Sequence, residues 1–180
     1  PRNYFPIAIT EFNSKTGERE ISMANAIFIA QALAEQIKNG FAASILWSFQ
    51  NGLDSYGGDH GMTARNSPIL NDHYPRPVFY IYHYFQKFMG DKMVWSYSSD
   101  SAVKSYATTF STGQKGIILV NNSAISKTVD LDFGSDTMRY NYYWYEVYAN
   151  NETDKKIFVN GQTSNFAEGG PENYASIPLY

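Results

Sequence analysis

A carboxylate and an indole each follow a short apolar run early in the chain. Glu11 closely follows the run at residues 7–9, and Trp47 follows the run at residues 42–46. Such runs are typical of buried strands in a parallel sheet, and α/β barrels keep their catalytic groups at the C-terminal ends of these strands. There a carboxylate can act as a nucleophile, and an indole can stack on a sugar ring. The alternative for Glu11 is a solvated residue that ends a structural strand.

Polar side chains lie just beyond both runs. Asn13 follows the first run, Gln50 follows the second, and the long loop at residues 51–74 contains Asp59 and His60. Loops of this length inside a compact domain are usually functional or disordered. Because this loop leaves the second strand at its C-terminal end, we expect it to line the same cleft. Its polar residues are candidates to bind sugar hydroxyls, and ordinary solvated loop residues are an equally good interpretation.

The elements that must position these residues form a strand–helix–strand unit. Ser22 is a plausible N-cap for a helix over Met23–Lys38, and residues 39–40 (Asn-Gly) supply its end. The helix connects strands predicted at residues 5–11 and 42–50. A βαβ unit implies parallel strands and a right-handed crossover. The two strands are therefore expected to be neighbours, with the carboxylate and the indole at the same end.

The sequence changes character near residue 91. Before it, a second helix is predicted at residues 77–89, and its aromatic stripe is assigned to the core. After it, short segments of strand type alternate with turn residues, a spacing that fits an antiparallel sandwich. These segments are residues 93–97, 103–110, 116–121, 127–133, 139–148 and 156–160. The segment at 139–148 has bulky aromatic residues on both faces, which suits either packing or a carbohydrate platform.

Composition limits the classes of function. The 180 residues carry a net charge of −3, which argues against nucleic acid as a partner, and there is no cysteine for disulfides or thiol catalysis. Aromatic residues make up 17% of the chain, and tyrosine and tryptophan suit sugar rings. The sequence shows no membrane-length apolar run and starts at Pro1 without methionine, so a processed or truncated start is expected. A secreted or periplasmic location is expected.

The segments at residues 9–13 (Ile-Thr-Glu-Phe-Asn) and 45–50 (Ile-Leu-Trp-Ser-Phe-Gln) carry a family resemblance. Together with the strand-rich second half, they resemble the C-terminal part of retaining (β/α)8-barrel glycoside hydrolases whose nucleophile lies on strand seven. Residues 166–177 also look like the sandwich-closing segment of agarases and porphyranases. The resemblance implies that Glu11 is the nucleophile and that Trp47 forms the floor of the −1 sugar subsite. It implies a polysaccharide or oligosaccharide substrate, with agar- or porphyran-type galactans as examples.

These observations predict an α/β plus all-β fold. Residues 1–91 would be the last two βα units of a TIM barrel, and residues 92–180 an antiparallel β-sandwich. Because a complete barrel takes roughly 250 residues, the chain is expected to be a fragment whose partner is the remainder of the same barrel. In the resembling family the general acid/base lies on strand four, so this fragment alone is expected to be inactive.

The predicted site has one catalytic residue and a set of substrate-binding residues. Glu11 is the catalytic nucleophile, and no metal, cofactor, nucleic acid or membrane is expected. The substrate-binding candidates are Trp47, Asn13, Gln50, His60 and Asp59.

Two other classes of function remain open on the sequence. A non-catalytic carbohydrate-binding or scaffold domain would use the aromatic face of residues 139–148, and its sugar binding would depend on Tyr142 and Trp144 rather than on Glu11 and Trp47. A structural interaction module would need an exposed apolar patch.

Overall fold

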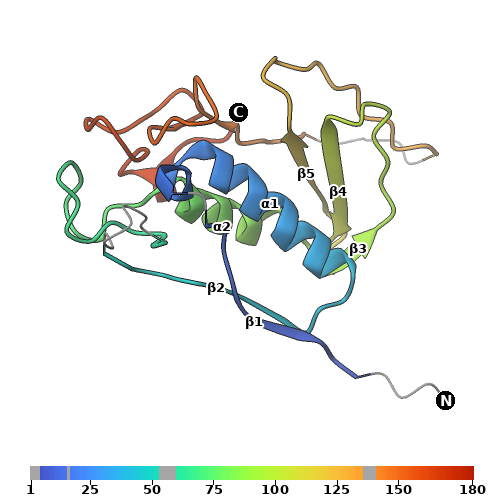
Figure 1. Ribbon diagram of the computed structural model, residues 1–180. Helices are drawn as coiled ribbons and strands as arrows, with labels where there is room; N and C mark the ends of the chain where they lie inside the picture. The colour runs from blue at the N-terminus through green and yellow to red at the C-terminus, as the bar shows by residue number, and fades with distance from the viewer. Residues whose placement is uncertain (1–4, 16, 53–59, 136–140) are drawn as a thin grey trace.

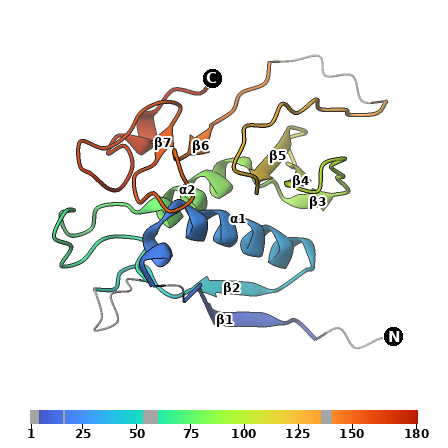
Figure 2. The same ribbon diagram turned by 45° about the horizontal axis from the view of Figure 1, so that its top comes forward.

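The structure, a computed structural model, describes residues 5–15, 17–52, 60–135 and 141–180. In Figure 1 and Figure 2 the two α-helices lie side by side at the centre, with β1 and β2 on one side of them and the C-terminal segment on the other. The order of elements is β1 (Ala8–Phe12), the 3-10 helix η1 (Gly17–Ile21), α1 (Met23–Lys38), β2 (Ala43–Leu46), α2 (Pro77–Phe88), β3 (Lys92–Val94), β4 (Val103–Thr109), β5 (Lys115–Asn121), β6 (Val147–Tyr148), β7 (Phe158–Val159) and the 3-10 helix η2 (Tyr174–Ser176).

The start of α1 is held by the C-terminal half of the chain. The predicted bounds of this helix are confirmed, and Ser22 occupies the N-cap position in an extended conformation. Its hydroxyl, however, donates to the carbonyl of Arg19 instead of capping the helix. The amides of Met23 and Ala24 donate instead to the carbonyls of Asp154 (2.9 Å) and Glu152 (2.7 Å). Two of the helix's otherwise unpaired amides are thus satisfied by a distant segment.

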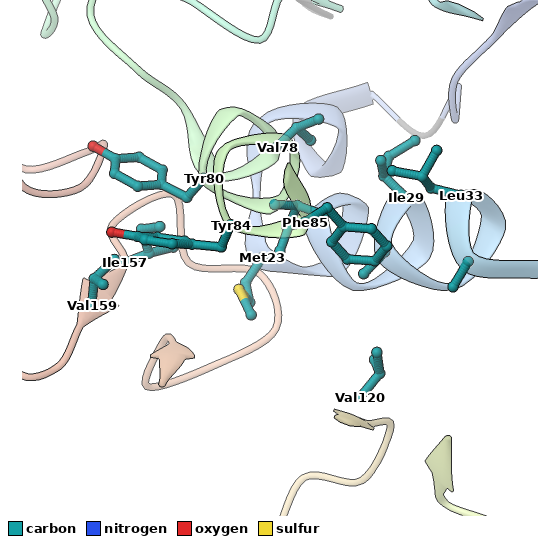
Figure 3. Close-up of a cluster of buried hydrophobic side chains, with 14 of the residues drawn as sticks. Met23, Ile29, Leu33, Val78, Tyr80, Tyr84, Phe85, Val120, Ile157 and Val159 are labelled. Carbon is teal, nitrogen blue, oxygen red and sulfur yellow. The ribbon is translucent and has the colours of Figure 1, made fainter. Parts of the chain in front are cut away.

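The main core lies between the two helices and the C-terminal segment. Tyr80 of α2 is fully buried, and its hydroxyl donates to the carbonyl of Pro171 at 3.0 Å. In Figure 3, Tyr80 and Tyr84 of α2 lie beside Ile157 and Val159 of the C-terminal segment. We call this buried set the helical core: Met23, Ala26, Ile29, Ala30, Leu33, Ala34, Val78, Tyr80, Ile81, Tyr84, Phe85, Tyr106, Val120, Ile157, Val159 and Ile177.

The parallel pairing of β1 with β2 confirms one architectural prediction. Ala8 pairs with Ala43 and Phe12 pairs with Leu46, with a shift of register between these two points. Phe12 and Leu46 pack against the helical core. The strands are shorter than predicted, and burial on both faces is wrong, because Ile45 remains 55% exposed. We call β1 and β2 the site strands.

The predicted fold class, two βα units of a TIM barrel followed by a β-sandwich, is wrong. The described residues form two α-helices and three small separate sheets: parallel β1-β2, antiparallel β3-β4-β5 and antiparallel β6-β7. Residues 127–133, all of them described, contribute no strand to any sheet. Of the described part of 139–148, only Val147–Tyr148 forms a strand.

The error has a physical cause. Residues 127–133 do alternate between apolar and polar side chains, but Val129 and Leu131 are 41% and 51% exposed. Alternation predicts a strand only where a second layer covers the apolar face, and here that face lies open. The boundary predicted between residues 91 and 92 remains a prediction. Within the described ranges, neither helix is long and apolar enough to cross a lipid bilayer.

Candidate functional site

The C-terminal ends of the site strands open into a hollow of about 380 Å³. We call it the strand-end hollow. Because the two strands are parallel, they bring Glu11 and Trp47 to the same end, as predicted. Glu11 is exposed, and Trp47 is 49% exposed, so both are accessible to a ligand. The lining residues are Glu11, Phe12, Asn13, Ser14, Lys15, Trp47 and His60.

Residues 60–62 run beside the end of β2 and bring His60 to the strand-end hollow. The amide of Trp47 donates to the carbonyl of Phe12 at 3.0 Å, which extends the β1–β2 ladder to the C-terminal ends of the two strands. We call these strand ends the rim. The following peptide bond, between Trp47 and Ser48, is cis. The Ser48 amide donates to the carbonyl of His60 (3.2 Å), and the Met62 amide donates to the carbonyl of Ser48 (2.9 Å). These hydrogen bonds explain how His60, thirteen positions after Trp47, reaches the same hollow.

Asn13 ties the segments of the hollow together. Its side-chain Nδ2 donates to the carbonyls of Trp47 and His60, and its Oδ1 accepts from the Ser14 amide at 2.8 Å. The same oxygen accepts from Nδ2 of Asn25, a buried residue of α1, at 3.1 Å. Each polar atom of the Asn13 amide thus has protein partners. The side chain positions both strand ends relative to the helix, and its predicted role in substrate binding remains a prediction.

A buried carboxylate lies behind the histidine. Nδ1 of His60 is 3.4 Å from Oε2 of Glu20, and the two side chains are 19% and 2% exposed. Glu20 belongs to η1, which the sequence suggests only as a polar loop. No spacing or motif distinguishes this glutamate from its exposed neighbours Glu18 and Arg19. Its contact with His60 depends on the path of the chain between β1 and α1, so sequence reasoning missed it.

Of the remaining two predicted substrate-binding residues, the structure describes only Gln50. Nε2 of Gln50 donates to the carbonyl of Ala64 at 3.1 Å and lies 2.9 Å from Nδ1 of His73. Gln50 therefore takes part in the hydrogen bonding of the following loop and lies outside the described lining of the hollow. Asp59 lies outside the described residues.

The hollow supplies one carboxylate among its described lining residues, that of Glu11. Retaining glycoside hydrolysis needs two carboxyl groups about 5–5.5 Å apart, one to attack and one to protonate the leaving oxygen. The described lining therefore holds one carboxyl group where that reaction needs two. Among the described residues, no group of three or more histidine or acidic side chains is arranged to hold a metal ion.

Comparison with known proteins adds no further guide to this site. No family model matches the chain, and no curated protein matches it. The strand-end hollow and the residues that line it are therefore the main guide to function within the part of the chain that the structure describes.

Proposed function

We propose that this chain carries the nucleophile side of the active site of a retaining glycoside hydrolase. One observation supports the proposal: an exposed carboxylate, Glu11, and a half-exposed indole, Trp47, line one hollow at the shared end of two parallel strands. The indole offers an apolar face to a sugar ring while the carboxylate faces the same space. The substrate class is a polysaccharide or oligosaccharide, with agar- and porphyran-type galactans as the first to test.

The proposed reaction is a double displacement. An oxygen of the Glu11 carboxylate attacks the anomeric carbon, and the bond from that carbon to the leaving oxygen breaks. The leaving oxygen takes a proton from a second carboxyl group, which then activates the water that releases the sugar. Since Glu11 is the only carboxylate in the described lining, natural glycans require an acid/base from outside it. A sugar whose leaving group needs no proton can react with Glu11 alone.

This difference gives a test on the chain as it stands. The protein is incubated with 2-deoxy-2-fluoro-β-galactosyl fluoride and, separately, with the glucosyl analogue. Attack by Glu11 expels fluoride, and the fluorine at C2 slows release of the sugar, so the ester accumulates. Mass spectrometry of peptides is expected to place one sugar on Glu11 with at least one of the two reagents.

Two variants serve as controls for the labelling. Glu11→Gln removes the attacking charge and is expected to abolish the adduct. Glu18→Gln removes a carboxylate whose side chain is 86% exposed and lies away from the lining, so labelling is expected to persist. Equal labelling of the wild-type and Glu11→Gln proteins, or labelling of neither, would overturn the proposal.

A second candidate function is carbohydrate binding without catalysis. Tyr142, Trp144 and Tyr180 form a row of exposed aromatic residues, 71%, 47% and 49% exposed. The ring centroids are 5.7 Å apart for Tyr142 and Trp144 and 5.6 Å apart for Trp144 and Tyr180. If this row is the working surface, Trp144→Ala abolishes retention on a polysaccharide gel and Glu11→Gln has no effect. Retention that survives Trp144→Ala would reject this candidate.

A further inference from the structure

A pair of aromatic side chains lies in solvent just after β3. Trp95 and Tyr97 are 86% and 72% exposed, and their ring planes are within 7° of parallel with centroids 6.3 Å apart. Residues two apart in an extended segment point to the same side, so both rings present themselves together. Tryptophan and tyrosine usually bury most of their area, which makes such an exposed pair informative about binding.

Tyr97, one member of this pair, also lines a polar hollow of about 230 Å³, which we call the β3 hollow. Trp95 is not among the described lining residues and lies two positions before Tyr97 on the same segment. Tyr97 forms part of its wall, together with Glu35 and Lys38 of α1 and Asp100 and Lys104 near or on β4. The lining therefore holds two carboxylates and two ammonium groups, and the charges balance. Serine side chains at four further positions add hydroxyl groups to the wall.

Several of these polar groups are fixed by contacts with their neighbours. Oε1 of Glu35 accepts from the hydroxyl of Tyr106 at 3.1 Å and lies 3.8 Å from Nζ of Lys38. Asp100 accepts from Nζ of Lys127 at 2.7 Å and from the Ala102 amide at 2.9 Å. These hydrogen bonds hold the pKa of the Asp100 carboxyl below its usual value and give each of its two oxygens a donor partner.

The combination of ring faces and balanced polar groups selects a class of ligand. A sugar has an apolar C–H face that stacks on aromatic rings, and its hydroxyls both donate to carboxylates and accept from ammonium groups. A strongly charged ligand would favour a lining of one sign, and a protein partner would favour a broader apolar surface. We propose that Trp95, Tyr97 and the β3 hollow form a carbohydrate-binding site.

This site is separate from the strand-end hollow. The two hollows share no described lining residue, and they are associated with opposite ends of α1. Asn25, which supports the strand-end hollow, and Glu35, which lines the other, are about 15 Å apart along the helix axis at 1.5 Å per residue. Figure 1 shows β3 beside the C-terminal end of α1. A second contact on one polysaccharide would raise the effective concentration of that chain at the protein.

Affinity electrophoresis tests the proposal without requiring any cleavage. Proteins are run in polyacrylamide gels that contain agarose, λ-carrageenan or xyloglucan, which represent a neutral galactan, a sulfated galactan and a glucan. All proteins carry Glu11→Gln so that turnover cannot alter the gel. At least one polysaccharide is expected to retard the parent protein, and Trp95→Ala with Tyr97→Ala is expected to weaken that binding about tenfold, the loss of roughly 1.4 kcal/mol.

Two further variants make the readout specific. Trp95→Phe with Tyr97→Phe keeps two ring faces and is expected to restore most of the retardation. Leu119→Ala truncates another exposed apolar side chain, on β5, and is expected to change nothing. Far-UV circular dichroism checks that every variant is folded. The proposal is overturned if no gel retards the parent protein, or if the double alanine variant is retarded as strongly as the parent.

Discussion

The helical core and the site strands differ sharply in how they use apolar side chains. In the helical core, Ile29, Tyr80, Ile157 and Val159 have no exposed area. Along the site strands and their extensions, Ile7, Ile45 and Phe49 are 55–63% exposed. Similar residue types are thus fully buried in one region and largely exposed in the other. The helices and the C-terminal segment bury most of the apolar core, whereas the site strands are a two-stranded layer whose C-terminal ends line the strand-end hollow.

The largest expected effect comes from equal truncations in the two regions. Ile29→Ala removes a fully buried side chain from α1 and is expected to lower the free energy of unfolding by about 2–5 kcal/mol. Ile45→Ala removes a side chain that is 55% exposed and is expected to cost less than about 1 kcal/mol. Urea denaturation measures both. Similar losses for the two variants would show that the site strands carry as much stability as the core.

A second comparison concerns the free space around two glycines, one on β5 and one in the segment that follows β2. A Cβ on Gly116 of β5 would lie 1.8 Å from the carbonyl oxygen of Phe88 at the end of α2. Gly116→Ala must therefore displace backbone and is expected to destabilise the protein by about 1–3 kcal/mol. A Cβ on Gly52, in the segment after β2, would meet its nearest atom at an ordinary 3.7 Å. Gly52→Ala is the matched control, and an equal shift in its melting temperature would contradict the comparison.

A third substitution breaks the link between the two regions. Asn13→Ala removes the bonds that join the strand ends to each other and to Asn25 of α1. We expect a loss of about 1–2 kcal/mol in unfolding free energy, together with slower labelling of Glu11 by the fluorosugar. Asn39→Ala removes one exposed side-chain bond at the other end of the same helix and serves as control. Normal labelling of Asn13→Ala would show that the rim keeps its shape without this residue.

The smallest expected effect is a pH dependence of the unfolding free energy that arises from His83 of α2. Burial, with a smaller contribution from the charge of Lys87, lowers the pKa of His83 below its usual 6.5. The unfolded chain then binds more protons than the folded chain, so this contribution to stability is complete above pH 6.5 and is lost as the pH falls through the folded pKa. His83→Phe keeps the ring contacts with Phe79 and Tyr174 but cannot titrate. Its stability should fall less between pH 7.5 and pH 5 in urea titrations, and an unchanged slope would contradict the assignment.

Local signals in the sequence predicted the elements that are determined locally. The helix over Met23–Lys38 has the predicted bounds because its apolar spacing and its Asn39 end lie within one short segment. The pairing of β1 with β2 followed from the helix between them, since a crossover helix implies parallel strands. This pairing alone was enough to place Glu11 and Trp47 in one hollow.

Other features depend on partners that the sequence does not mark. The alternation at residues 127–133 contains Val129 and Leu131, yet no layer covers them, and an apolar pattern cannot show whether such a layer exists. The contact between Glu20 and His60 joins residues that no motif connects. The fold class failed for the same reason, because short apolar runs are common to barrels and to small isolated sheets.

The start of α1 has a consequence for how the chain is made. Its first amides are paired with the carbonyls of Glu152 and Asp154, which a ribosome adds about 130 residues later. At roughly 5–20 residues per second, the helix must wait many seconds for these acceptors. During that interval its first turn can only pair with water or fray, and Asn25, which anchors the strand ends, lies in that turn. Assembly of the rim therefore follows synthesis of residues 152–154, although the rim residues themselves are made well before them.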